Sequence, residues 1–172
     1  YAGYVNKRNE IEQELEKIDR SKANANYSLY GELKRRETFN ASGQILHEIY
    51  WGSLGGDGNL INSLDIARHM ERDFGSLVAW KEDFVASAKA SLGWAILCYD
   101  SSDMKLHNYL CDFHNNGAVW GAQPLLAIDV FEHAYYHDYG PDRAKYIDAY
   151  LSNVDWNKVN TVFKGVFKKA LD

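Results

Sequence analysis

Hydrophobic residues recur at helical spacing through the first third of the chain. Over residues 5–18 apolar positions repeat every three or four residues, and charged residues fill the other face, a pattern typical of an amphipathic helix. The same spacing predicts helices over residues 23–36 and 40–51, with Asn40 as the N-cap of the second. Because a glycine-rich segment follows, we expect an N-terminal helical hairpin domain over residues 1–56.

The pattern changes character in the middle of the chain. Residues 66–92 mix apolar and charged positions at helical spacing and predict two short helices that are broken near Gly75. Residues 93–99 and 105–113 predict two strands of a hairpin, because a polar DSSD turn joins them. The apolar run over residues 124–131 predicts a third strand.

The last part of the chain again favours helices. Pro141 marks the start of one helix, and a cationic amphipathic helix is expected over residues 155–172. Helices combined with a small antiparallel sheet of about three strands indicate the α+β class. We therefore expect a C-terminal α+β domain over residues 57–172.

Charge and cysteine content narrow the class of protein. The 172 residues carry a net charge of -5, which argues against nucleic acid or an anionic membrane as the main partner. No apolar run reaches the length of about 18 residues that a transmembrane helix needs. Cys98 and Cys111 fall at distant positions of the predicted hairpin, so we expect two free thiols and a cytoplasmic location.

Three polar residues are candidates for a metal site. Asp129 and His133 lie four positions apart, so a carboxylate and an imidazole can face one cation. His47 shares a predicted helix face with Tyr50 and Trp51. Two imidazoles and one carboxylate among aromatic rings suit a redox-active first-row ion better than zinc. The alternative is a helix-initiating aspartate with two histidines in a hydrophobic core.

Four short segments carry a family resemblance. They are DVFEHAYY at 129–136, LHEIYW at 46–51, GWAIL at 93–97 and YVN at 4–6. Their order and spacing resemble those of the iron/manganese superoxide dismutases over almost the whole chain. The resemblance implies an enzyme that converts superoxide to dioxygen and hydrogen peroxide at one mononuclear iron or manganese site per subunit.

The resemblance assigns roles to individual residues. It implies that His47, Asp129 and His133 are metal ligands. It makes Tyr4 the gateway tyrosine of a substrate funnel, and it places His114 with Tyr4 in a proton relay.

Further residues are implied to surround the metal and to join two subunits. The aromatic wall around the metal would consist of Trp51, Trp94 and Phe131, the last in place of the family's usual tryptophan. Glu132 and Tyr136 would reach the partner subunit of a homodimer or homotetramer. Arg143 would lie near the substrate funnel, where its positive charge would attract the superoxide anion.

One position differs among members of the family and bears on metal preference. The family usually has a glutamine beside the metal-bound solvent, either on the middle-ligand helix or on the sheet. Gly43 stands at the first place, Gln44 is one residue away from it, and His114 stands at the second, which resembles archaeal-type members. The choice between iron and manganese stays open, and so does the alternative that His114 is an exposed loop residue.

The start of the chain gives two further alternatives. The family's first histidine ligand lies eight residues before the gateway tyrosine, so counting back from Tyr4 places it ahead of Tyr1. We expect either a preceding N-terminal segment or a catalytically impaired or non-enzymatic dimeric relative with an incomplete metal site. Two histidines and a carboxylate also bind metal in non-haem iron oxygenases, but these usually have a β-barrel, which the helix-rich pattern opposes.

Overall fold

The computed structural model describes residues 1–171 and the side chains of residues 1–170. Its helices and its antiparallel sheet confirm the predicted α+β class. The chain divides into two compact units, Tyr1–Glu48 and Ile49–Asp172, and the division falls inside a helix. The predicted domains, 1–56 and 57–172, stay a prediction.

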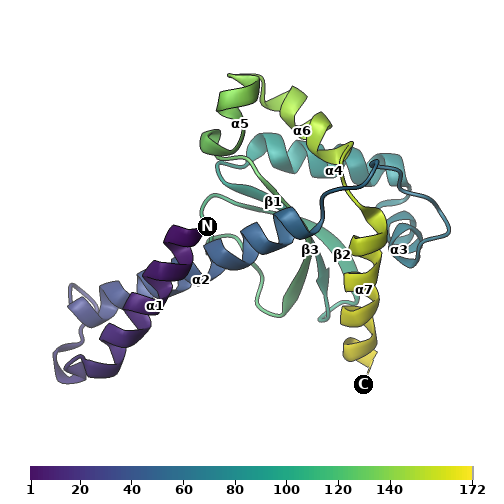
Figure 1. Cartoon of the computed structure of the whole chain (residues 1–172). Coiled ribbons are helices and arrows are strands. Elements are labelled where there is room, and N and C mark those ends of the chain that lie inside the picture. The colour runs from purple at the N-terminus through teal and green to yellow at the C-terminus, as the bar shows by residue number, and fades with distance from the viewer. Residues whose placement is uncertain (172) are drawn as a thin grey trace. The chain divides into compact units, whose positions relative to one another are not determined.

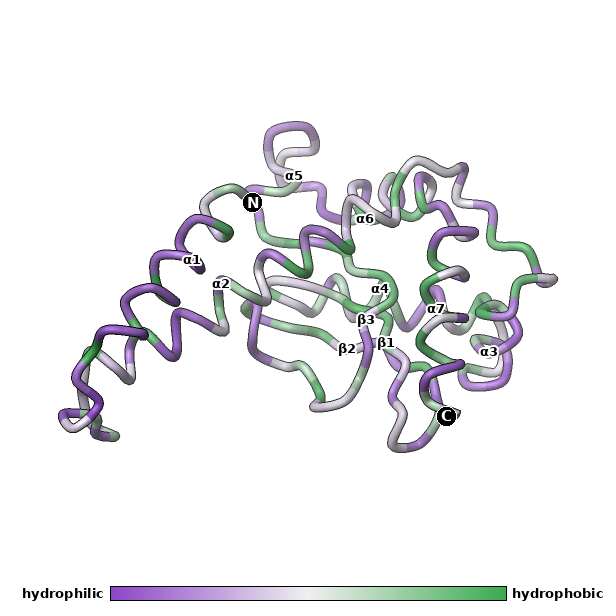
Figure 2. Tube along the Cα trace, turned by 60° about the horizontal axis from the view of Figure 1, so that its bottom comes forward, coloured by the Kyte–Doolittle hydropathy of each residue, from purple (hydrophilic) through white to green (hydrophobic). Residues whose placement is uncertain are grey.

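The first unit is a pair of helices with a small apolar contact. Its elements are α1 (Ala2–Lys17), a 3-10 turn (Arg20–Lys22) and most of α2 (Leu29–Gly52). Ile11 and Leu15 of α1 are buried with Leu33 of α2, and most other positions of α1 are hydrophilic (Figure 2). A narrow apolar stripe on an otherwise charged helix is the pattern that predicted α1.

The prediction of two helices over 23–36 and 40–51 is wrong, because α2 is a single helix. Asn40, the predicted N-cap of the second helix, lies inside α2. Its side chain instead donates from Nδ2 to the carbonyl of Arg36 at 2.7 Å, one turn earlier in the same helix. An asparagine can bond to a backbone group at either place, so its identity alone does not mark a helix start.

The second unit contains the sheet. Its elements are α3 (Asp65–Phe74), α4 (Leu77–Ala90), β1 (Trp94–Asp100), β2 (Lys105–Cys111), β3 (Ala122–Asp129), α5 (Glu132–Tyr139), α6 (Arg143–Leu151) and α7 (Trp156–Leu171). Gly75 ends α3 in the left-handed conformation with φ 88°, and the Ser76 hydroxyl caps α4 by accepting from the Ala79 amide. The predicted break near Gly75 is therefore confirmed.

The sheet has the antiparallel order β2-β1-β3, so β1 is central and β3 is an edge strand. Asp129 at the end of β3 pairs with Trp94 at the start of β1. The predicted third strand, 124–131, extends two residues too far. The Phe131 amide donates to the Asp129 carboxylate at 3.0 Å instead of continuing the ladder, and this local turn leads into α5.

Helices pack on the sheet to form the core of this unit. Ala95, Leu97 and Tyr99 of β1 are buried in one cluster with Phe84 of α4 and Phe163 of α7. Figure 1 shows α3, α4 and α7 beside the sheet, and Figure 2 shows hydrophobic residues along β1 and β3. The core therefore fixes the ends of the strands from which the polar residues of the candidate site project.

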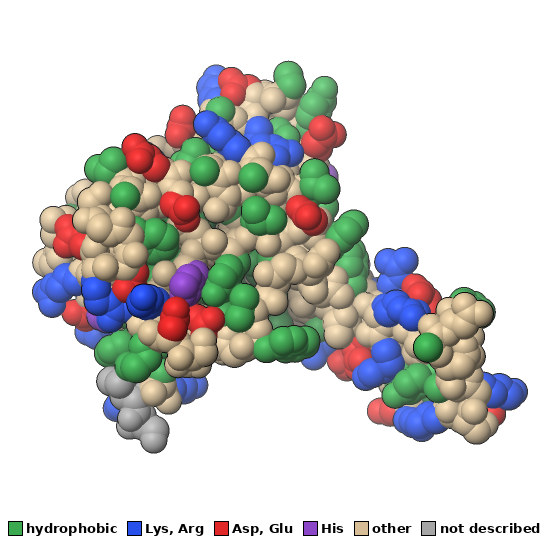
Figure 3. Space-filling model, turned by 180° about the vertical axis from the view of Figure 1, so that it is seen from behind, with side chains coloured by type: hydrophobic (Ala, Val, Ile, Leu, Met, Phe, Trp, Pro, Cys, Tyr) green, Lys and Arg blue, Asp and Glu red, His purple; other side chains and the backbone are tan. Residues whose placement is uncertain are grey.

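The remaining features of the fold are the charged side chains of the surface and the two cysteines. Lysine and arginine side chains are interspersed with acidic ones on the face in Figure 3. Cys98 and Cys111 are free thiols, as predicted, and both are buried. None of the helices in the described part of the chain is both long and apolar enough to cross a membrane.

Candidate metal centre

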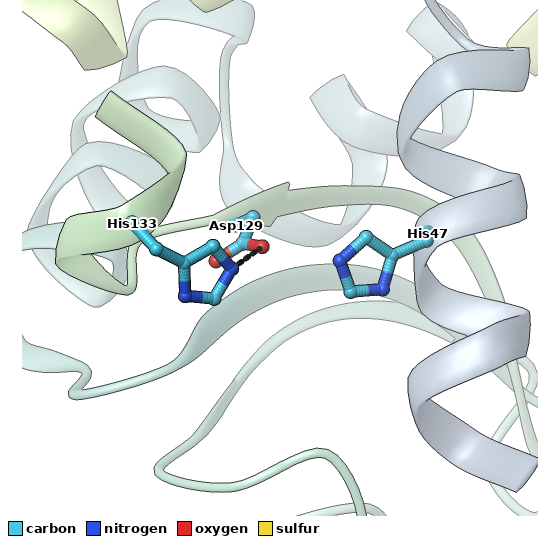
Figure 4. A group of neighbouring side chains, drawn as sticks. All are labelled: His47, Asp129 and His133. Atoms are coloured by element: carbon cyan, nitrogen blue, oxygen red, sulfur yellow. Dashed lines mark ion pairs between the residues drawn. The ribbon is translucent and has the colours of Figure 1, made fainter. Parts of the chain in front are cut away.

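Asp129 and His133 meet where β3 passes into α5. Nε2 of His133 lies 3.3 Å from Oδ2 of Asp129, and Figure 4 shows this pair as sticks. The other carboxylate oxygen, Oδ1, accepts the Phe131 amide. One oxygen therefore orients the carboxylate and the other faces the imidazole.

The burial of the carboxylate distinguishes this pair from an ordinary surface ion pair. Asp129 is only 2% exposed, and a buried carboxylate needs a positive partner or a metal ion. A second histidine–aspartate pair at the same spacing, His107 and Asp103, has partly exposed side chains on both sides. Of these two pairs, the one at the end of β3 thus combines a buried acid with an imidazole.

The donor atoms fit a first-row metal ion. Two ligands that each lie about 2.1 Å from an ion, roughly at a right angle, are about 3 Å apart, which is close to the 3.3 Å observed. A carboxylate oxygen with an imidazole nitrogen suits iron or manganese. Asp129 and His133 can therefore serve as neighbouring ligands of such an ion.

His47 lies on α2 in the first unit, and Figure 4 labels it there. Its Nδ1 lies 2.6 Å from the carbonyl oxygen of Gly43. Because a carbonyl only accepts, Nδ1 carries the hydrogen, and Nε2 of the neutral ring has the lone pair that a metal needs. In the same unit the Tyr4 ring lies 5.4 Å from the His47 ring.

His114 is held in one tautomer by Trp94. The indole Nε1 of Trp94 donates to Nδ1 of His114 at 3.0 Å, so the hydrogen of the neutral imidazole is on Nε2. His114 is 3% exposed, and the alternative of an exposed loop residue is therefore wrong. The ring of Phe131 lies 5.4 Å from His114 and stacks on His133 at 5.5 Å. Aromatic and imidazole rings thus form a continuous wall beside Asp129.

Comparison with known proteins identifies the family of this chain. Residues 62–162 match the family described as iron/manganese superoxide dismutases, C-terminal domain. The chain belongs to the iron/manganese superoxide dismutase family. The matched range contains Trp94, His114, Asp129 and His133.

Relatives named for either metal cover most of the chain. Superoxide dismutase (Mn) 2 of Haloferax volcanii is 42% identical over 158 residues, which are 92% of this chain and 78% of the relative. Superoxide dismutase (Fe) of Aquifex aeolicus is 44% identical over 171 residues, which are 98% of this chain and 80% of the relative. The similarity thus extends through both compact units.

Two family positions lie on the exposed side of α5. Glu132 is exposed, and Tyr136 is 54% exposed. Among residues 1–170 no side-chain hydrogen bond or ion pair within the chain fixes either one. Trp51 of α2 is likewise half exposed. Their predicted roles at a subunit contact and in the aromatic wall stay predictions for this superoxide dismutase family member.

Arg143 is part of the scaffold of the second unit. Its Nε donates to the hydroxyl of Tyr135 at 3.2 Å, and its Nη1 donates to the carbonyl of Ser91 at 2.8 Å. These bonds join the start of α6 to α5 and to the end of α4. The proposed attraction of superoxide by Arg143 stays a prediction.

Sequence reasoning missed Tyr146 of α6. This buried residue donates its hydroxyl hydrogen to the backbone carbonyl of Asp129 at 2.7 Å. Burial raises the pKa of the Tyr146 hydroxyl, so it stays protonated at neutral pH. A single buried tyrosine has no sequence signal of its own, because tyrosines are abundant in this chain.

Proposed function

We propose that this protein is a superoxide dismutase, which converts superoxide to dioxygen and hydrogen peroxide with one bound iron or manganese ion. The observation that carries the proposal is the buried Asp129 beside His133 inside the range that matches the family. When bound, the ion would supply one-electron redox chemistry, which the side chains lack. Because relatives named for manganese and for iron are similarly identical to the chain, we propose either metal.

His47, Asp129 and His133 would hold the ion. The tautomer of His47 leaves Nε2 as its metal-binding atom. Tyr50 follows His47 by three residues on the continuous helix α2 and so shares its face. The Tyr50 hydroxyl lies 3.2 Å from that of Tyr146, which binds the Asp129 carbonyl.

The residues around the ligands would orient reactants and exclude water. Trp94 and Phe131 are apolar surfaces next to the ligand pair, and Trp51 would complete this wall. His114 offers an N–H donor at Nε2, because Trp94 occupies its Nδ1. A donor of this kind can hold oxygen atoms or pass on a proton, and the Tyr4 hydroxyl would supply the second proton-carrying group.

The functional protein would be a homodimer or a homotetramer. Glu132 and Tyr136 support this, because they are exposed on α5 directly beside the ligand His133. Glu132 would accept a hydrogen bond from His133 of the partner subunit, which would orient that imidazole toward the metal. Tyr136 would face the substrate funnel of the other subunit. Arg143 would add positive charge near the funnel.

We also propose a cytoplasmic location. Cys98 and Cys111 are free thiols in the structure, and free thiols are typical of a reducing compartment. Fractionation of the native cells followed by detection of the protein tests this, and recovery outside the cytoplasm would contradict it.

Superoxide decay, followed by stopped-flow absorbance with the full chain loaded with iron or manganese, tests the function. We expect catalytic decay with at least one metal. His133→Ala should lose both bound metal and activity, because a ligand is removed. His107→Ala is the matched control, since His107 also pairs with an aspartate four residues away, and it should retain both. Metal bound without catalysis would instead support a non-enzymatic relative.

A further inference from the structure

Two tyrosines of α6 bind backbone carbonyls of β3, one at Asp129 and one two residues earlier, at Ala127. The Tyr146 hydroxyl donates to the carbonyl of Asp129 at 2.7 Å, and the Tyr150 hydroxyl donates to the carbonyl of Ala127 at 2.8 Å. Both tyrosines are at least 95% buried. Both bonds therefore lie in the protein interior, where an unpaired carbonyl is unfavourable.

The helix and the strand match in their spacing. Four residues along an α-helix advance about 6 Å, and two residues along a strand advance about 6.8 Å. Tyr146 and Tyr150, which are four residues apart on α6, can therefore reach two carbonyls that are two residues apart on β3. These two carbonyls lie on the outer side of an edge strand, since the Val130 amide bonds inward to Gly93. The two hydroxyls thus donate the hydrogen bonds that a neighbouring strand would otherwise give to these carbonyls.

A third tyrosine connects this arrangement to α2. The Tyr146 oxygen lies 3.2 Å from the Tyr50 hydroxyl. Tyr146 has one hydroxyl hydrogen, and the Asp129 carbonyl can only accept it, so Tyr50 donates to Tyr146. The Tyr50 ring also stacks on Tyr150 with centroids 5.3 Å apart and planes at 19°. Tyr50 therefore contacts both hydroxyl-bearing residues of α6.

The ring of Tyr146 is held on its other side by α5. Tyr135 stacks on it with centroids 5.2 Å apart and planes at 16°. Arg143 fixes Tyr135 through the hydrogen bond to its hydroxyl. Tyr146 thus contacts both α5, the helix that carries His133, and the backbone of Asp129 itself.

We propose that Tyr146 is a positioning residue for the Asp129 carboxylate. By holding the Asp129 carbonyl it fixes the backbone from which the carboxylate projects, and this role rests on the proposed function of Asp129 as a ligand. Tyr150 makes an equivalent bond to Ala127, whose methyl group cannot bind a metal. The two tyrosines are therefore chemically alike and differ in which strand residue they hold.

The first test needs no metal. The Phe131 amide donates to Oδ1 of Asp129, so its hydrogen exchange reports whether that carboxylate stays in place. In the metal-free protein, measured by nuclear magnetic resonance, Tyr146→Phe should speed exchange of this amide about ten-fold relative to neighbouring amides. Tyr150→Phe should change the ratio less than about two-fold. Equal effects of the two variants, or no effect of Tyr146→Phe, would overturn the proposal.

The second test measures the metal directly. In competition with a chelator, Tyr146→Phe should weaken Mn(II) binding about ten-fold, and Tyr150→Phe should leave it within about two-fold of the unaltered protein. Equal weakening would mean that both tyrosines only stabilise the strand edge. If the unaltered protein bound neither manganese nor iron, the proposed function would fail, while the exchange test would still decide the role of Tyr146.

A milder variant covers the case in which Tyr146→Phe does not fold. Tyr50→Phe removes only the hydrogen bond to the Tyr146 oxygen and keeps the Tyr146–Asp129 bond. It should speed exchange of the Phe131 amide about three-fold, because linked hydrogen bonds strengthen one another. An unchanged Phe131 rate in a folded Tyr50→Phe protein would contradict the proposal.

Discussion

Trp94 fixes the protonation of His114. The indole N–H donates to Nδ1 of the imidazole at 3.0 Å, and both residues are buried. Nε2 must therefore carry the hydrogen while the ring is neutral. His114 is thus a hydrogen-bond donor at Nε2 with a defined direction.

Loss of the indole donor should release the His114 tautomer. Trp94→Phe keeps an aromatic ring, but Nδ1 of His114 then has no indole partner, so both tautomers should be populated. The ¹⁵N chemical shifts of the imidazole would report this change. Superoxide dismutation should fall about ten-fold, as is usual when a residue that orients a metal-site group is altered.

Trp80→Phe is the matched control for this change. Trp80 is also buried and donates from its indole nitrogen, but to Asn108 at 3.2 Å. It should affect stability without altering the His114 shifts. An unchanged tautomer in Trp94→Phe would refute the assigned role of Trp94.

Removal of the Glu132 carboxylate should weaken subunit association. Under the proposed arrangement Glu132→Ala loses a hydrogen bond across the interface to a ligand histidine, so monomers should form at higher protein concentration than in the unaltered chain. Analytical ultracentrifugation measures the shift, which we expect to be about ten-fold or more in the dissociation constant. As a control, Glu82→Ala changes an exposed glutamate of a different helix, α4, and it should have no effect on association. Equal behaviour of the two variants would count against the proposed interface.

The buried thiols should make the fold less stable in alkaline solution. Burial raises the pKa of Cys98 to about 12 and that of Cys111 to about 11. The pKa of a thiol in an unfolded chain is about 8.5. Between these values the unfolded chain loses protons that the folded chain keeps. The stabilisation is therefore complete below pH of about 8 and is lost as the pH rises through the folded-state pKa values.

Cys98→Ala isolates this effect. Chemical unfolding of the metal-free protein between pH 8 and 10 should show a smaller decline of the free energy of unfolding in the variant, by about 1 kcal/mol per pH unit. Parallel curves for the variant and the unaltered protein would show that Cys98 does not titrate in this way.

Much of the fold follows from local patterns. The break at Gly75 was predictable because a left-handed residue before a serine cap has a clear signature. The strand pattern of β1 was equally clear, since a central strand is apolar on both faces. By contrast, Asn40 looked like a helix start, and only its bond to Arg36 identifies it as an interior residue of α2.

The candidate site was predictable only in part. Asp129, His133 and His47 could be named because their residue types are those of metal ligands and because their motifs resemble a known family. The tautomer of His114 and the bond from Tyr146 to Asp129 were not predictable, since both depend on contacts between residues that are distant in sequence. Every residue has a backbone carbonyl, so a hydroxyl that binds one does not restrict the residue type of its partner and gives no pattern in the sequence.

The metal content of two aspartate variants tests the central claim most directly. The full chain, Asp129→Asn and Asp103→Asn would be purified after growth with iron and manganese, and analysed by inductively coupled plasma mass spectrometry. Both aspartates face a histidine four residues later, but only Asp129 is the proposed ligand. We predict about one iron or manganese ion per chain in the unaltered protein and in Asp103→Asn, and a loss of most of it in Asp129→Asn. Equal metal content in the two variants would contradict the account.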